Sequence, residues 1–303
     1  MKRSNAAIWL SWLVVALALV SAVVGAFWQG GGGPFAFTTL RGETVEIAGQ
    51  GLYRYDTSFK APIQRGSDVV TLLVSIPLLV LATLRYRRGS LRGGLLLAGA
   101  LGCLLYNAAS LAFGAAYNSL FLVYIAWFSA SLFALVLVCR SIDLAALPAR
   151  VSPRLPRRGI AVFVMLSGLT LCVWLVDIIS ALAQGQPPAG LASNTTEVTS
   201  VIDLGIIMPT AIFASIALLR RAGPGYLFTT VILVLNAIIG VTVLGQTVVQ
   251  TLDGITLTVA EYVAKVGVFT LTGLIASALV AAILRSVAEP AAQPPAALQA
   301  ARA

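Results

Sequence analysis

The sequence predicts an all-α polytopic membrane protein with about eight transmembrane helices, and three observations support this fold class. First, 59% of the 303 residues are hydrophobic and only 10% are charged, whereas a soluble domain carries roughly 25% charged residues. Second, the chain contains apolar runs that can each cross a hydrocarbon core of roughly 30 Å. Third, the basic residues gather in alternate connections between these runs. The lipid bilayer is therefore the first partner that we expect.

The predicted spans follow the apolar runs and are separated mostly by short connections. They cover residues 7–28, 68–84, 93–114, 117–139, 159–183, 200–219, 225–250 and 257–284. The first run is about 22 residues long, which exceeds the 7–15 residues typical of the apolar core of a signal peptide. We therefore expect an uncleaved span there.

Basic residues precede the first span and follow the second, fourth, sixth and eighth spans. They are Lys2, Arg3, Arg85, Arg87, Arg88, Arg92, Arg140, Arg150, Arg154, Arg157, Arg158, Arg220, Arg221 and Arg285. Because short cytoplasmic loops carry the excess of Lys and Arg, we expect cytoplasmic N- and C-termini in a bacterial plasma (inner) membrane. The net charge of +9 is then a topology signal, and we expect no nucleic acid as a partner.

The first outer loop, residues 29–67, is the only sizeable connection between the spans on the outer side. Within it, Thr44–Ile47 and Leu52–Tyr55 flank a turn at Gly49–Gly51. Alternation around a Gly-rich turn predicts a small β-hairpin, which we expect to rest on the helix ends because an isolated hairpin is marginal in water. At the other end of the chain, residues 287–303 predict a disordered cytoplasmic tail, since its sequence is rich in Pro and Ala.

An internal repeat is also predicted. When Pro77 is aligned with Pro209, Gly93 falls on Gly225 and the arginine pairs of the following turns fall one residue apart. The halves, residues 1–150 and 151–286, each contain four spans. Because four is an even number, both halves share one orientation, which is a parallel 4+4 duplication. The alternative is that basic turns recur only because the topology requires them.

Composition and motifs exclude several kinds of chemistry. The chain contains no histidine, and its three cysteines lie far apart in apolar runs. His-ligated haem, His-containing zinc sites and His-based acid–base catalysis are therefore excluded. The sequence carries no Cys-X-X-Cys pair and no hydrolase or metalloprotease signature. We expect no metal and no cofactor, and an enzyme is the less favoured class.

Ionisable side chains inside predicted spans are the best candidates for function because they are costly in lipid. Asp177 lies roughly 9 Å below the outer end of span five and has no capping role. Lys265 lies at a similar depth in span eight, so we expect an Asp177–Lys265 pair at the floor of a polar cavity open to the outside. Glu261 lies one turn above Lys265 and competes for it.

Further polar side chains lie at the same outer level and extend the predicted binding site: Asp203, Tyr106, Asn107 and Asn236. The ligand would be a small polar or cationic solute or an ion. Structural alternatives stand beside this hypothesis. Asp203 and Glu261 match helix capping boxes, Asp68 matches a helix start, and the asparagines are typical of interhelical hydrogen bonds.

Two resemblances follow from short motifs. Glu261–Gly267 resembles the retinal-lysine helix of microbial rhodopsins, but it lies in span eight and spans six and seven contain no tryptophan, so retinal is not expected. As a whole, the chain resembles a group of uncharacterised multi-pass bacterial membrane proteins, on Gly51–Asp56, Tyr117–Tyr124 and Asp203–Pro209. That resemblance implies a multi-pass fold and no particular activity.

Three classes of function remain open at this point. The first is a secondary transporter, permease or channel-like protein for a small polar solute or ion. The second is a non-catalytic membrane component, such as a sensor, an assembly factor or a complex subunit, whose partner is another membrane protein. The third is a membrane-embedded lipid-modifying enzyme. A water-filled funnel, a sealed apolar interior or a lateral cleft at headgroup level would favour these classes in that order.

Overall fold

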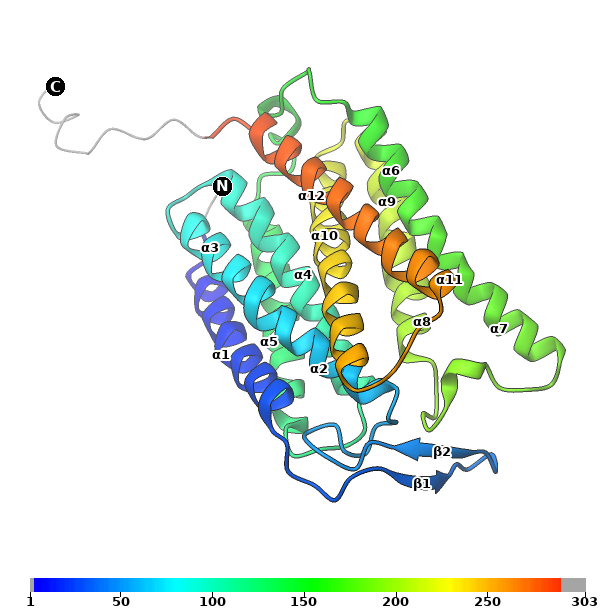
Figure 1. The fold of residues 1–303 in the computed structure, drawn as a ribbon. Helices are drawn as coiled ribbons and strands as arrows, with labels where there is room; N and C mark the ends of the chain where they lie inside the picture. Colours follow the sequence, from blue (N-terminus) through cyan, green and yellow to red (C-terminus); the bar gives the residue numbers. More distant parts are fainter. Residues whose placement is uncertain (1–2, 290–303) are drawn as a thin grey trace, which may run out of the picture.

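The computed structural model describes residues 3–289 and arranges them as a helical bundle with a small two-stranded sheet at one end (Figure 1). Within these residues, eight helices are long and apolar enough to cross a membrane. They agree with the predicted spans in number and order. Most of the predicted tail, from residue 290 onward, lies outside the described residues.

The N-terminal half contains four of these helices and the sheet. Its elements are α1 (Asn5–Phe27), β1 (Phe35–Thr38), β2 (Thr44–Ile47), α2 (Lys60–Val70), η1 (Thr71–Ser75), α3 (Ile76–Arg87), α4 (Leu91–Gly114) and α5 (Phe121–Ser141). The π-helical turn η1 joins α2 and α3 into one continuous span, Lys60–Arg87.

The C-terminal half contains the other four long helices. After the short η2 (Pro148–Arg150), which ends the N-terminal half, its elements are α6 (Arg157–Leu169), η3 (Thr170–Cys172), α7 (Val173–Ala183), η4 (Ala189–Leu191), α8 (Val198–Ile202), η5 (Asp203–Ile207), α9 (Met208–Leu219), α10 (Gly223–Leu252), α11 (Val259–Glu261), η6 (Tyr262–Gly267) and α12 (Val268–Ser286). Three of its spans are composite, Arg157–Ala183, Val198–Leu219 and Val259–Ser286.

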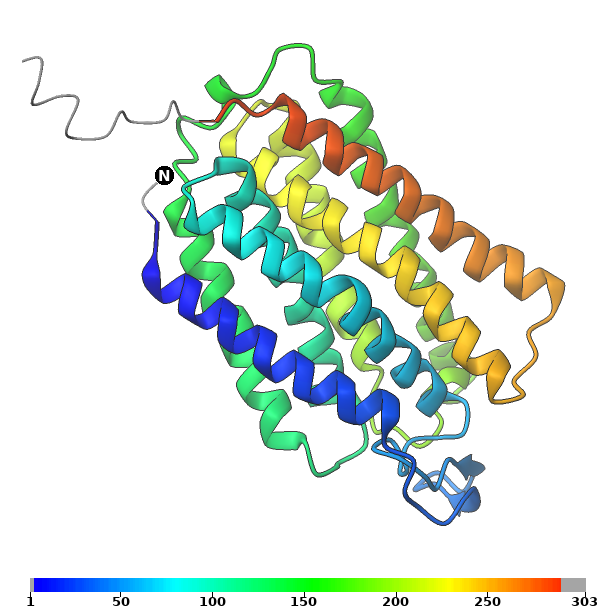
Figure 2. The ribbon, with the colours of Figure 1, turned by 60° about the vertical axis from the view of Figure 1, so that its left-hand side comes forward.

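Helices of the N-terminal half close on one another around a shared core. α1 packs on α5, α2 and α3, while α4 packs on α3 and α5. The views in Figures 1 and 2 agree that α1 and α5 lie side by side. Trp127, Tyr124 and Tyr86 are among the largest fully buried side chains of this core. Aromatic side chains bury a large area each, so they fill the space between crossing helices.

Helices of the C-terminal half form an open arc instead. α6 packs on α9, α9 packs on α10, and α10 packs on α12. Within residues 3–289, α6 and α12 share no extensive contact, so the two ends of the arc do not meet. α10 also packs on α2 and α4 and thereby joins the two halves.

Glycines allow α10 to approach its neighbours closely. A Cβ added at Gly66 of α2 would lie 2.7 Å from the Gly245 carbonyl oxygen of α10, and one at Gly240 would lie 2.8 Å from the Gly273 Cα of α12. Small residues at such crossings bring the helix backbones together and replace side-chain packing. The joint between the halves is therefore a contact of backbone on backbone.

The two halves share several local features. Two of the three π-helical turns in the described residues, η1 and η5, begin at Thr71 and Asp203, and a proline follows each near the start of the next helix, Pro77 in α3 and Pro209 in α9. The separation of the turns equals the separation of the prolines. A π-helical turn accommodates an extra residue, and proline removes one backbone donor there.

The turn that follows each proline-containing span is also similar. Gly89 and Arg221 both have positive φ angles, 86° and 57°, and Arg221 therefore holds a conformation that favours glycine. A Cβ at Gly93 would meet the backbone of residues 85 and 86, and one at Gly225 would meet the backbone of residues 217 and 218. Each helix that leaves the turn thus packs directly on the helix that enters it.

The hairpin forms, but the predicted strand pairing is wrong. β2 (Thr44–Ile47) pairs antiparallel with β1 (Phe35–Thr38), and Leu52–Tyr55 forms turns instead of a strand. The reversal lies at residues 39–43, where the Thr39 amide donates to the Glu43 carbonyl at 2.8 Å. Gly49 and Gly51 have positive φ and lie against the backbone of residues 28–33. Glycine at these positions lets the two chain segments come close together.

Span two starts earlier than predicted, at Lys60 instead of residue 68. The helix extends outward through a polar segment that hydropathy excludes, because tertiary contacts hold that segment. Arg65 forms an ion pair with Asp253 at the end of α10, and the Gln246 amide donates to the Ser67 hydroxyl at 2.8 Å. The predicted outer loop therefore ends at residue 59.

Residues 287–289, which the sequence places in the tail, are packed against the bundle. Val287 is fully buried and forms a bridge with Val151. The Glu289 carboxylate accepts hydrogen bonds from the Ser90 hydroxyl at 2.6 Å and the Leu91 amide at 2.8 Å. A carboxylate at this position stabilises the N-terminus of α4.

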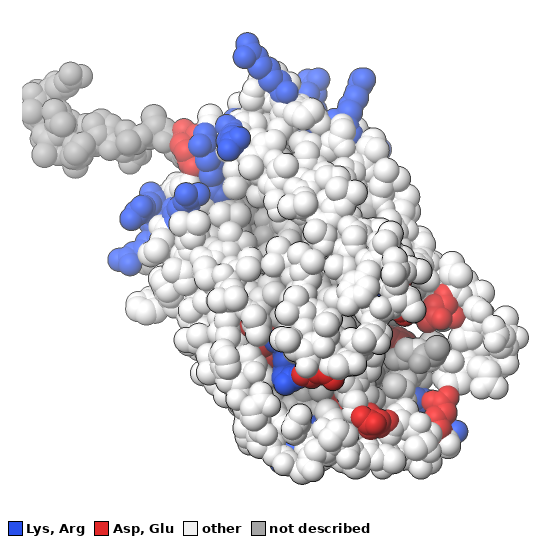
Figure 3. All heavy atoms as spheres, in the orientation of Figure 1, with Lys and Arg blue, Asp and Glu red and all other residues white. Residues whose placement is uncertain are grey.

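Charged residues separate toward opposite ends of the bundle. On the face shown in Figure 3, Lys and Arg gather around the N-terminus and the end of α12, the middle is apolar, and Asp and Glu lie mostly at the other end. The sheet marks the acidic end (Figure 1). We call these ends the basic end and the sheet end.

Candidate functional site

The predicted Asp177–Lys265 pair does not form. Among the described residues, no salt bridge involves either side chain, and both residues are exposed. The Lys265 ammonium lies 5.8 Å from the centre of the Phe59 ring, which is a cation–π distance. Asp177 lies on α7, at the opposite edge of the open arc from α12. The pair therefore does not form a floor for a cavity.

Glu261 caps a helix, which is the structural alternative that the sequence predicts for it. Its carboxylate accepts from the Thr258 amide and hydroxyl, both at 2.8 Å, and Thr258 accepts from the Glu261 amide. This is a complete capping box at the start of α11. The box satisfies free N–H groups at the helix terminus. The Glu261 carboxylate is therefore engaged by Thr258 and does not pair with Lys265.

Asp203 and Tyr106 do come together, at the centre of the sheet-end half of the bundle. Asp203 is the first residue of η5 and is only 7% exposed. Its carboxylate accepts from the Tyr106 hydroxyl of α4 at 3.1 Å and from the Trp174 indole N–H of α7 at 3.0 Å. Three helical segments thus place a carboxyl group between two neutral donors. Within residues 3–289 no cation pairs with it.

Asp203 is also not a cap, because the continuous span Val198–Leu219 begins five residues before it. A buried carboxyl group without a counter-charge is costly when it is ionised. Neutral donors offset part of this cost, and a proton or a cation would offset the rest. The arrangement can therefore hold a proton or bind a cationic group reversibly.

The two asparagines lie near this cluster but take separate partners. The Asn107 amide donates to the Thr71 hydroxyl of η1 at 3.3 Å, so the adjacent residues Tyr106 and Asn107 contact η5 and η1 respectively. The Asn236 amide donates to the Ser167 hydroxyl at 3.0 Å and joins α10 to α6. Asn236 therefore forms an interhelical hydrogen bond within the open arc.

A hollow of about 520 Å³ lies at the sheet end, between the hairpin and the segment that precedes α8. Aromatic side chains form one wall and small polar residues form the other: Phe35, Phe37, Tyr55 and Phe113, and Ser193, Asn194, Thr195 and Thr196. Val198 also lines it, and Asp203 lies five residues further along the same helix, roughly 7.5 Å deeper at the helical rise. Asp203, Tyr106 and Trp174 do not line the hollow, so Val198 and its helix are the link between the hollow and the Asp203 cluster.

Lys60 and Asp56 fix one side of this hollow. The Lys60 ammonium pairs with the Asp56 carboxylate at 3.2 Å and donates to the Asn194 side-chain oxygen at 3.1 Å and to the Gly114 carbonyl. Burial raises the pKa of Asp56, and Lys60 opposes that shift. This cluster ties the outer loop to the start of α2, the end of α4 and the segment before α8.

A second buried carboxyl group belongs to the N-terminal half. Asp68 is 3% exposed and accepts from the Tyr53 hydroxyl at 2.7 Å. Gly25 of α1 has no room for a Cβ, because that atom would overlap the Asp68 carboxyl group and lie 2.9 Å from the Tyr53 hydroxyl. Burial and the neighbouring Asp68 raise the pKa of Tyr53, so the phenol remains the donor. This carboxyl group is sealed by the outer loop and α1.

Asp177 lies near another acid. Burial raises the pKa of Glu197, the neighbouring Asp177 carboxylate raises it further, and Lys60 lowers it. Glu197 directly precedes α8, so the two carboxylates lie at the outer edge of the open arc. Their repulsion is a surface effect on the C-terminal half and does not reach Asp203.

Two site residues escape sequence reasoning. Trp174 is an apolar residue in an apolar span, and only the fold shows that its N–H reaches Asp203. Asp68 resembles a helix start, but it lies in the interior of the span Lys60–Arg87. The residues before Asp68 are polar but helical, and recognising that helix would have placed Asp68 inside the span.

Metal binding and known relatives give no further guide to the site. Among the described residues, no cluster of three or more Cys, Asp or Glu side chains can hold a metal ion. Comparisons of the chain with protein-family models, curated proteins and solved structures found no match.

Proposed function

We propose that the protein is a secondary transporter or permease-like protein that moves a small polar solute or an ion across a plasma (inner) membrane of bacterial type. The hollow at the sheet end would admit the solute, and Asp203 would carry the proton or contact the cationic group. The single observation behind this proposal is Asp203 itself, a buried carboxyl group with two neutral donors and no cation partner among residues 3–289.

The π-helical turn at Asp203 supports the same proposal. Such turns occur frequently at functional sites, because the extra residue loosens the local backbone hydrogen bonding. Asp203 begins the turn, and Trp174 reaches it from α7, which lies just beyond the short 3₁₀ segment η3. Irregular helices near a buried polar group are typical of transport proteins.

We further propose that the basic end faces the cytoplasm, with both termini there. The segregation of Lys and Arg toward one end of the bundle supports this orientation, since positive residues are retained on the cytoplasmic side. The bundle would then be a parallel 4+4 duplication with halves 1–150 and 151–286. Support comes from the equally spaced π-helical turns, prolines and left-handed turn residues.

A flux assay in proteoliposomes tests the transport proposal. Vesicles with pH- and cation-sensitive dyes would report flux through the wild-type protein and through Asp203→Asn, which keeps the size of the side chain and removes its charge. We expect flux in the wild type and none in Asp203→Asn. Asp177→Asn is the matched control, because it removes an exposed carboxylate from the same half and should retain flux.

Two outcomes would contradict the proposal. Unchanged flux in a folded Asp203→Asn variant would make the cluster structural. Absence of wild-type flux for every ion and solute tested would favour a non-catalytic membrane component. The test of that second candidate is capture of a membrane partner.

A further inference from the structure

We propose that a second site, at the basic end between α1 and α3, binds the phosphate headgroup of an anionic phospholipid. A hollow of about 780 Å³ opens there, and its lining is Arg3, Asn5, Ile8, Trp9, Trp12 and Arg87. This volume lies within the range of about 300–1,000 Å³ that is usual for small-ligand sites. The proposal shares the membrane placement given above but does not depend on transport.

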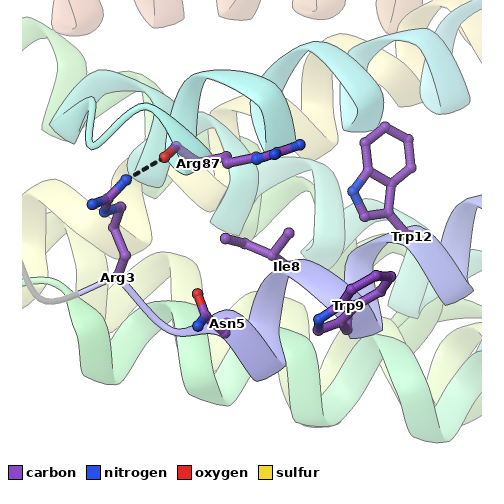
Figure 4. A pocket seen from close by; sticks show the side chains of 6 residues that line it. All are labelled: Arg3, Asn5, Ile8, Trp9, Trp12 and Arg87. Atoms are coloured by element: carbon purple, nitrogen blue, oxygen red, sulfur yellow. Dashed lines mark hydrogen bonds between the residues drawn. The ribbon is translucent and has the colours of Figure 1, made fainter.

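The charge of the hollow favours an anion. Arg3 and Arg87 are exposed, and no salt bridge among residues 3–289 engages either guanidinium group. The Arg3 guanidinium donates to the Arg87 carbonyl at 2.7 Å, which fixes the N-terminal segment beside the end of α3. Figure 4 shows the two guanidinium groups toward different ends of the hollow. Each suits phosphate, because its planar donors can bind phosphate oxygens in pairs.

The position of the hollow favours a lipid over a soluble anion. Figure 4 shows the Arg87 side chain extending along one side of the hollow toward Trp12, while Asn5, Ile8 and Trp9 follow α1 on the other side. Trp9 is 75% exposed. Tryptophan prefers the membrane–water interface, where its ring contacts acyl chains and its N–H contacts headgroups. The hollow therefore combines arginines, which suit a phosphate headgroup, with indoles, which suit the start of the acyl chains.

The start of α1 contributes a further favourable field. Asn5 is the first residue of this 23-residue helix, Ser4 caps it, and its first turn contains no acidic residue. The N-terminus of a helix attracts an anion through its free N–H groups. The Ser4 amide donates to the buried Tyr86 hydroxyl at 3.0 Å, so the helix start is held in place beside Arg87.

The corresponding place in the C-terminal half lacks these features. Leu219 stands where the repeat places Arg87. At the start of α6, the Arg157 guanidinium donates to the Tyr226 hydroxyl at 3.2 Å, and no tryptophan lies in the first turns of that helix. Basic residues at this end are therefore not sufficient to form such a site. Those outside the hollow can serve as matched controls in an experiment.

Quenching of tryptophan fluorescence by brominated lipids tests the proposal. The full-length protein would be reconstituted in phosphatidylcholine vesicles that contain either phosphatidylglycerol or phosphatidylcholine with brominated acyl chains. We expect stronger quenching by brominated phosphatidylglycerol at the same mole fraction. Arg3→Gln with Arg87→Gln should weaken this preference by about fivefold for each arginine, since each basic residue near the surface contributes about this factor.

Three controls separate the alternatives. Arg220→Gln with Arg285→Gln removes the same charge from the same end and should retain the preference. Trp9→Phe with Trp12→Phe should abolish the lipid-specific quenching and thereby assign the signal to the hollow. Inorganic phosphate should not relieve the quenching; if it does so at millimolar concentration, the site binds free phosphate and the lipid proposal is wrong.

Equal quenching by the two brominated lipids would overturn the proposal, as would a preference that survives in the folded Arg3→Gln, Arg87→Gln variant. Folding of each variant would be checked by its elution volume in detergent and its helical circular dichroism. Because the measurement needs no flux, its failure is distinguishable from failure of the transport proposal.

Discussion

The two halves of the bundle have comparable helices but close differently. In the N-terminal half, α1 packs along α5, so the four spans surround one core. In the C-terminal half, α6 and α12 occupy the corresponding ends of the arc and share no extensive contact within residues 3–289. The closed half buries Asp68 behind Tyr53 and Gly25, whereas the open half holds Asp203 through donors from two other helices. A similar set of helices can thus serve as a rigid support or as an adaptable site.

The largest expected effect is overpacking of the closed half. Gly25→Ala places a methyl group on the Asp68 carboxyl and beside the Tyr53 hydroxyl, and because the atoms would overlap we expect a loss of stability of about 3 kcal/mol or more. The measurement is the apparent unfolding temperature in detergent. Gly205→Ala in η5 is the matched control, because nothing lies within 4 Å of its added Cβ. Equal effects at the two glycines would contradict the distinction between the halves.

A smaller effect is expected from removing one donor from each buried carboxyl group. Tyr53→Phe leaves Asp68 without its only side-chain donor in the described structure, and we expect a cost of about 1–3 kcal/mol. Tyr106→Phe leaves Asp203 with Trp174, and the cost should be only about 1 kcal/mol. The comparison fails if Tyr106→Phe is the more destabilising change in the same unfolding assay.

The smallest effect concerns pH and the outer edge of the open half. Because the pKa of Glu197 is raised in the folded state, its contribution to stability is present below the unfolded pKa and is lost as pH rises through the folded pKa. Asp177→Asn removes the neighbouring charge, so it should reduce this loss and raise stability slightly near neutral pH. Unfolding temperatures measured from acidic to neutral pH test this expectation. A steeper pH dependence in Asp177→Asn would contradict the repulsion between Asp177 and Glu197.

Sequence reasoning predicted the helical fold well because hydropathy reports burial in lipid directly. Eight apolar runs became eight long helices, and Thr258–Glu261 formed the predicted capping box. It failed where long-range contacts decide the structure. Span two extends to Lys60 because Asp56, Asp253 and Gln246 hold its polar start, and the hairpin pairs Thr44–Ile47 with an earlier strand.

The candidate site was only partly predictable for a related reason. Depth along a helix follows from counting residues, so Asp203 and Tyr106 were placed at one level. The direction in which a side chain points depends on helix rotation and on which helices are neighbours. Asp177 and Lys265 share a level but lie at opposite edges of the arc, and Trp174 faces inward from the same helix as Asp177.

The glycine crossings of α10 limit how this molecule can move. At Gly66–Gly245 and Gly240–Gly273 the backbones themselves are in contact, so sliding along these crossings would require main chains to separate. α6 and α7 are attached chiefly through α9, and the 3₁₀ segment η3 interrupts them at Thr170–Cys172. Alternating exposure of Asp203 to the two sides of a membrane would therefore proceed by a swing of α7 about η3, with α10 and α12 stationary.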